Sequence, residues 1–226
     1  QRMVLKMVRS NELVTRREVA SAFVDTASAR VILPVVALLA VVRLITGDWG
    51  RGDIAATLAV VALTGPAEWV IHLYLLHASP EAWSSRRLGT GSGHREHHLD
   101  PPELKWLLLR GVDAAVFLVM LAIFAAAWSV PLALLIGDRS WPIYLTAVTL
   151  TAAGLGHYEW THLLVHSGYH PTSRYYARLA RNHRRHHYRN ERYWLGITSN
   201  LGDRLMRTLP KADADVARSE TARTLS

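Results

Sequence analysis

Four stretches of the chain are almost entirely apolar, and each is long enough, alone or with its flanks, to be read as a membrane-spanning helix. They cover residues 29–46, 54–77, 112–136 and 143–166. The third is the cleanest, because Asp113 is its only charged residue and a helix of this length would extend about 37 Å at 1.5 Å per residue. The first reaches spanning length only with Arg30 and Arg43 included, so we expect both arginines to snorkel toward the membrane surfaces.

The segments between these stretches alternate in length and charge. Residues 47–53 and 137–142 are short, whereas residues 78–111 and 167–210 are long and basic. Lysine and arginine concentrate in the cytoplasmic loops of membrane proteins. The pattern predicts an all-α integral membrane protein with four transmembrane helices in two hairpins, and with both termini and a helical cap in the cytoplasm.

The domain organisation follows from the same pattern. We expect one membrane-embedded domain over residues 1–210, in which the cap comprises residues 78–111 and 167–210. Within the cap, residues 173–192 are basic with interleaved tyrosines and predict a helix at the membrane interface. The remaining residues 211–226 are small, polar and charged, which predicts a disordered tail.

Composition narrows the chemistry. The chain of 226 residues has no cysteine, which excludes disulfides, thiolate zinc sites and iron–sulfur clusters within it. Its net charge of +8 would suit a nucleic-acid binder, but that class does not explain four apolar stretches, so we expect no nucleic-acid partner. The first residues are basic and mixed and lack a small-residue cleavage site, so no cleavable signal peptide is expected.

Ten of the twelve histidines fall into four clusters, each at the end of a hydrophobic hairpin. Neutral imidazole is a common ligand of iron and zinc. Ten imidazoles are too many for one ion, whereas two ions with four or five nitrogens each would use them all and leave a position open for a small reactant. The candidate metal ligands are His72, His77, His94, His97, His98, His162, His166, His183, His186 and His187.

The spacing within the clusters bears on how they bind. Two clusters have the spacing HxxHH, which places three imidazoles on one helical face, and His162 and His166 also share a face. His72 and His77 are five residues apart, so either the helix is distorted at its end or the two side chains serve different metals. His157 and His170 lie outside the clusters, and we expect neither to contact metal.

Two carboxylates accompany the spaced histidine pairs. Glu68 lies four residues before His72, and Glu159 lies three before His162. A metal-bound imidazole usually donates its second N–H to a carboxylate or a carbonyl. Glu68 and Glu159 are therefore candidates for orienting the ligands, although either could instead pair with another buried donor.

Four stretches together carry a family resemblance: HLYLLH at 72–77, GHREHHLDPP at 93–102, EWTHLLVHSG at 159–168, and HRRHHYRN at 183–190 followed by LGITSNLGD at 195–203. Over about residues 72–209 the chain resembles the fatty acid hydroxylase superfamily, membrane di-iron enzymes that include sterol desaturases and carotenoid hydroxylases. The last stretch is similar to the fatty acid 2-hydroxylase branch in particular.

The resemblance implies that the ten clustered histidines hold two iron ions, which zinc can replace in purified protein, and that O2 is the co-substrate. It implies a monooxygenase that hydroxylates an unactivated C–H bond of a lipid acyl chain in the membrane. No segment resembles the haem domain fused to many relatives, so we expect a separate electron donor, either a ferredoxin, a cytochrome or a reductase.

Two alternatives remain open from the sequence. The first is a desaturase, or a hydroxylase that acts on a sterol or carotenoid, because the metal ligands would be the same. The second is a membrane protein that binds or transports metal. Transport would favour polar residues at the middle of the spans, whereas here they gather at one end.

Overall fold

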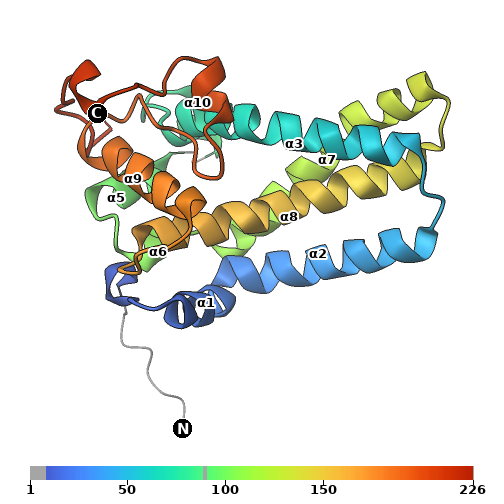
Figure 1. Ribbon diagram of the computed structural model, residues 1–226, viewed down its shortest axis with the longest axis horizontal. Helices are drawn as coiled ribbons and strands as arrows, with labels where there is room; N and C mark the ends of the chain where they lie inside the picture. Colours follow the sequence, from blue (N-terminus) through green and yellow to red (C-terminus); the bar gives the residue numbers. More distant parts are fainter. Residues whose placement is uncertain (1–8, 89–90, 226) are drawn as a thin grey trace, which may run out of the picture. The chain divides into compact units, whose positions relative to one another are not determined.

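The computed structural model describes residues 9–88 and 91–225, and within them all regular secondary structure is helical (Figure 1). The chain forms two compact units. We call residues 24–64 and 109–159 the bundle unit. The histidine unit comprises residues 1–23, 65–108 and 160–226, so far as they are described. In chain order the longer elements are α1 (Arg16–Asp25), α2 (Ala27–Thr46), α3 (Arg51–Ile71), α5 (Ser92–Leu99), α7 (Gly111–Ile136), α8 (Ser140–His166) and α9 (Arg174–Tyr188).

The bundle unit contains α2, α7, and most of α3 and α8, and its helices pack through small residues. A Cβ atom at Gly111 would lie 3.5 Å from the carbonyl oxygen of Ala27, so α7 begins close against α2. Ala56, Ala133 and Ile143 form one buried cluster. Small side chains let helix backbones approach closely, which is the usual packing between transmembrane helices.

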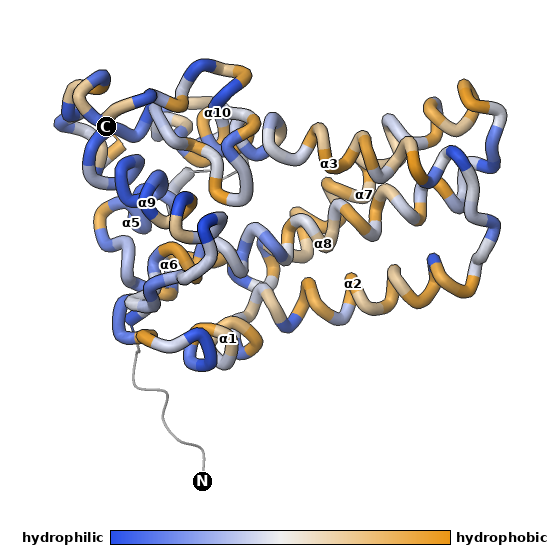
Figure 2. Tube along the Cα trace, in the orientation of Figure 1, coloured by the Kyte–Doolittle hydropathy of each residue, from blue (hydrophilic) through white to orange (hydrophobic). Residues whose placement is uncertain are grey.

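Most residues of α2, α3, α7 and α8 are apolar, as the hydrophobic colouring in Figure 2 shows, and many of them are exposed. Ile45 and Leu135 are 80% and 85% exposed. Exposed apolar surface on this scale is costly in water and suits contact with lipid. Three helical segments of the described chain are long and apolar enough to cross a membrane: Ala27–Thr46, Arg51–Leu76 and Leu104–Ile136.

Three of the four predicted spans therefore have a counterpart, and the fourth remains a prediction. The helix α8 has 27 residues, which is a sufficient length. It is more polar, however, and contains the threonines Thr146, Thr149 and Thr151 in its first half, where the last two donate to carbonyls one turn earlier. By composition alone α8 does not qualify as a span.

The prediction that Arg43 snorkels is wrong. Its side chain is 3% exposed and donates to Asp53 Oδ1 at 2.6 Å and to Thr146 Oγ1 at 2.6 Å. The guanidinium also lies over the ring of Trp49, 3.5 Å from the ring centroid. A buried arginine is tolerated only when its donors are satisfied. Asp53 and Thr146 supply the hydrogen-bond acceptors that were expected from the membrane surface. Arg30 is exposed and pairs with Asp25.

The histidine unit gathers the ends of α3 and α8, the short helices α4 (Trp83–Leu88), α5, α6 (Leu104–Leu107) and α10 (Leu201–Leu205), and the longer α9. Both segments predicted to form the cap contain helices. Its packing is close: a Cβ atom at Gly202 would lie 2.5 Å from the carbonyl oxygen of Gly65. Only glycine lets the two backbones approach so closely, and the contact fixes the start of α10 against the last turns of α3.

The expectation of a disordered tail over 211–226 is wrong for the described residues 211–225. A 3₁₀ turn forms at Asp213–Asp215, and Val216 and Ala222 are each 3% exposed. Arg189 donates two hydrogen bonds to the carbonyl of Val216, at 2.7 and 3.0 Å, and Arg223 donates to the carbonyl of Leu99 at 2.6 Å. The composition misled because main-chain carbonyls, rather than apolar side chains, carry most of these contacts.

Candidate metal centre

All ten clustered histidines converge in the histidine unit, in two groups of five. Within each group one ring nitrogen from every histidine lies within 4.8 Å of the others. Site 1 consists of His72, His77, His94, His98 and His186, and site 2 of His97, His162, His166, His183 and His187. The sites adjoin, because the rings of His98 and His187 stack with centroids 4.1 Å apart.

The HxxHH motifs divide between the sites in a reciprocal way. On α5, His94 and His98 belong to site 1 and His97 to site 2. On α9, His183 and His187 belong to site 2 and His186 to site 1. Each site thus combines one spaced pair, the i, i+4 pair of one motif and the middle histidine of the other. This composition has the symmetry of a pseudo-twofold axis, although the local sequences share little else.

The spacing of His72 and His77 is explained by a π turn. After α3 ends at Ile71, residues His72–Leu76 form a π-helical turn, and the N–H of His77 donates to the carbonyl of His72 at 3.0 Å. A π turn closes after five residues rather than four, so positions i and i+5 come onto one face. Of the two readings of this spacing, the distorted helix end is confirmed, and both histidines lie in site 1.

Main-chain carbonyls orient three of the five imidazoles of site 1. The Nδ1 atoms of His72, His98 and His186 lie 2.6, 2.8 and 2.9 Å from the carbonyl oxygens of Leu195, Ala222 and Tyr193. A carbonyl oxygen can only accept, so each Nδ1 must carry the proton. The Nε2 atom of each ring is then unprotonated and directs its lone pair into the site, as a metal ligand requires.

These carbonyls take the part that was predicted for the carboxylates. Glu68 is buried and accepts from the backbone N–H groups of Ile197 and Thr198 at 2.5 and 2.8 Å and from the Thr198 hydroxyl at 2.7 Å. Glu159 accepts from the backbone N–H of Leu109 at 3.0 Å. Among the described residues, neither carboxylate is hydrogen-bonded to a clustered histidine. Each instead satisfies backbone donors that have no partner in a helix or sheet.

Glu68 still acts on the site through one loop. Residues 195–200 run past the last turn of α3, and Glu68 holds Ile197 and Thr198 while Asp203 accepts from the N–H groups of Leu195 and Gly196, both at 2.9 Å. The loop they fix carries the Leu195 carbonyl that orients His72. Sequence reasoning noted Asp203 only as part of the motif; its role depends on contacts that the sequence does not display.

The donor set fits metal ions. The Nε2 atoms of His77, His98 and His186 in site 1, and both ring nitrogens of His97 in site 2, are buried without a hydrogen-bond partner among the described residues. Such atoms are costly to bury unless something binds them. In site 2, the Nε2 atom of His183 lies 2.7 Å from His166 Nε2 and 3.0 Å from His187 Nε2. Two nitrogens that share an ion at about 2.0–2.1 Å are about 3 Å apart at right angles.

The surroundings keep these imidazoles neutral. Burial, reinforced by the neighbouring histidines, lowers the pKa of His97, His183 and His187 well below its usual range. Burial also lowers the pKa of His98, to about 4, although the Ala222 carbonyl opposes the shift. A neutral ring is the form that binds metal, so burial prepares the ligands. Outside these two groups, His157 and His170 belong to neither site.

Comparison with known proteins agrees with this site. The family model described as fatty acid hydroxylase matches residues 19–208. Among solved structures, the hydroxylase domain visible in full-length Scs7p is similar, with a TM-score of 0.60 and 20% sequence identity, covering 92% of this chain and 70% of that one. At this identity the likeness shows the fold alone. No curated protein matches the chain in sequence. Because the family model covers most of the chain and includes all ten clustered histidines, the chain belongs to the fatty acid hydroxylase family.

Proposed function

We propose that the protein is an O2-dependent membrane oxidoreductase that hydroxylates an unactivated C–H bond of a lipid acyl chain with two iron ions. The observation that carries the proposal is the pair of adjoining five-histidine sites in one compact unit. The balance of the reaction is fixed: one C–H bond, one O2, two electrons and two protons give one alcohol and one water. When bound, the two ions supply the centre at which O2 is reduced.

In this reaction the chain itself would hold the two ions, orient their imidazole ligands and exclude bulk water. Neutral imidazoles suit a centre close to a membrane, where charged ligands would cost more to bury. The carbonyls of Leu195, Tyr193 and Ala222 fix the direction of three ligands before any ion binds, which is preorganisation. His97, His98, His186 and His187 are completely buried, so bulk water is kept from the centre.

Mass spectrometry of the total lipids of a host that expresses the chain tests the proposal. We expect lipids with one additional oxygen in cells expressing the wild type, and none in cells expressing His186→Ala, which removes a site 1 ligand. His157→Ala is the matched control, because it removes an exposed histidine outside both sites.

The product distinguishes the competing reactions. Lipids that lose two hydrogens without gaining oxygen would identify a desaturase, and an oxygenated sterol or carotenoid would change the substrate class. If the host receives iron and a reductase system and its lipids stay unchanged, the acyl-lipid proposal is wrong.

A further inference from the structure

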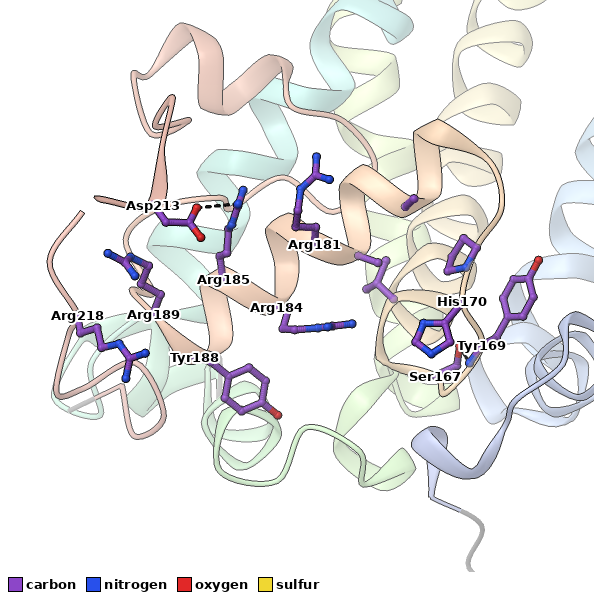
Figure 3. Close-up of a pocket in the computed structure, with 14 residues that line it drawn as sticks. Ser167, Tyr169, His170, Arg181, Arg184, Arg185, Tyr188, Arg189, Asp213 and Arg218 are labelled. Atoms are coloured by element: carbon purple, nitrogen blue, oxygen red, sulfur yellow. Dashed lines mark hydrogen bonds and ion pairs between the residues drawn. The ribbon is translucent and has the colours of Figure 1, made fainter. Parts of the chain in front are cut away.

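Besides the two metal sites, the histidine unit has a strongly basic groove along α9. It has a volume of about 590 Å³ and is lined by five arginines and one carboxylate: Arg181, Arg184, Arg185, Arg189, Arg218 and Asp213. Figure 3 shows Arg181, Arg184, Arg185 and Arg189 projecting from α9, with Arg218 contributed by the tail. Two of the five are already used, because Arg185 pairs with Asp213 at 2.7 Å and Arg189 donates to the Val216 carbonyl.

The other three arginines have no polar partner in the part of the chain that the structure describes. Within the described residues, no hydrogen bond or ion pair is made by the side chains of Arg181, Arg184 or Arg218, and all three are exposed. Like charges gathered without counter-charges repel one another, so the arrangement costs free energy unless an anion binds. The groove is therefore complementary to a surface with several negative charges.

The position of the groove on α9 suggests which surface binds there. The buried face of the same helix carries His183, His186 and His187, which contribute to both metal sites. A ligand in the groove is thus separated from these imidazoles by the thickness of one helix, about 10–12 Å with side chains. The exposed Tyr188 also lines the groove, and tyrosine and arginine are the residues that most often dominate protein interfaces.

We propose that this groove docks the acidic face of a protein electron donor. The inference rests on the proposed function, since hydroxylation consumes two electrons that must come from outside. They would arrive one at a time from two reduced donor molecules, each of which leaves oxidised by one electron. Docking on the outer side of α9 places the donor beside a helix that contributes ligands to both metal sites.

The test measures donor binding and donor oxidation separately. The probes are an acidic [2Fe–2S] ferredoxin and an acidic haem cytochrome. Each is added to the metal-loaded 226-residue chain in neutral phosphatidylcholine nanodiscs and, in parallel, in nanodiscs that also contain anionic lipid. The variant carries Arg181→Glu, Arg184→Glu and Arg218→Glu. The control carries the same charge change at Arg174, Arg178 and Arg204, which are exposed and outside the groove.

We expect the wild type to bind at least one probe with an affinity that falls as salt is added. The groove variant should bind oxidised donor about tenfold more weakly, or weaker still, and its binding should depend little on salt. It should also accept electrons from reduced donor more slowly by about the same factor. Reduction by dithionite and the metal content should not change, which excludes damage to the sites.

Three results would overturn the inference: no salt-sensitive binding of either probe by the wild type, an equal loss in the control variant, or a loss that appears only in anionic nanodiscs. The last would assign the groove to lipid head groups instead. Failure of the proposed function is a separate outcome, because it would leave the lipids of the host unchanged while donor binding still depended on the groove.

Discussion

At the scale of single residues, the metal centre depends on groups that are not ligands. The carboxylate of Asp203 is fully buried and accepts from the N–H groups of Leu195 and Gly196 and from the hydroxyl of Thr208. A Cβ atom at Gly196 would lie only 1.9 Å from the carbonyl oxygen of Ser199. The GITS sequence and the aspartate that follows it are thus explained by one tight turn, which presents the Leu195 carbonyl to His72.

Replacing Asp203 by asparagine tests this explanation. One carboxylate oxygen becomes an NH₂ group that faces a buried donor, and a buried donor left without its acceptor costs about 1–3 kcal/mol. We expect Asp203→Asn to lower the free energy of unfolding by this amount and to reduce the metal content, chiefly through loss from site 1. Thermal unfolding and metal analysis per chain measure both effects.

The control for this change is Asp25→Asn, which alters an exposed ion pair with Arg30 that contributes little to stability. If Asp203→Asn keeps two metal ions and unfolds at the wild-type temperature, the turn does not position His72.

At the scale of elements, regular sequence patterns predicted the long helices and the ligand faces. Features that depend on a single local distortion or a single distant contact were not predicted. The long helices α2, α3 and α7 follow from apolar composition, and the ligand faces of α5 and α9 follow from the HxxHH spacing. The π turn at His72–Leu76 was one of two readings, because nothing in HLYLLH distinguishes it from an α-helix. The burial of Arg43 depends on Thr146, a partner 103 residues away.

The tail is the element whose prediction differed most, and its removal gives a direct test. Ala222 supplies the carbonyl for His98, while Arg223 donates to the carbonyls of His98 and Leu99. We expect a chain truncated after residue 210 to lose metal mainly from site 1, because His98 Nδ1 loses its acceptor and the ring its orientation. Loss of such an orienting partner typically weakens metal affinity about 10–100-fold. We therefore expect the metal content to fall by about one ion per chain.

Single changes within the tail provide the comparison. Arg223→Ala should reproduce part of the loss, whereas Arg218→Ala, which removes an exposed arginine without a hydrogen bond, should retain both ions. A truncated protein that holds two ions as tightly as the full chain would show that the tail does not support the site.

At the scale of the whole molecule, the composition of the histidine unit constrains how often the chain crosses the membrane. The unit contains residues from three separate parts of the chain, before residue 24, between 65 and 108, and after 159. We expect the histidine sites of this unit to lie on one side of the membrane, so the chain between the three parts should cross it an even number of times. Leu104–Ile136 is a candidate span, so we predict that α8 returns across the membrane despite its polar residues.

Because the chain has no cysteine, single cysteines can report this topology directly. We expect cysteines at Glu81 and Glu220 to react with a membrane-impermeant maleimide only after the cells are opened, and cysteines at Arg51 and Arg139 to react in intact cells. Labelling of Glu81 and Glu220 from opposite sides would mean that α8 does not cross. In that case α5 and α9 would be separated by the membrane, and neither five-histidine site could form, because each site needs a histidine from both helices.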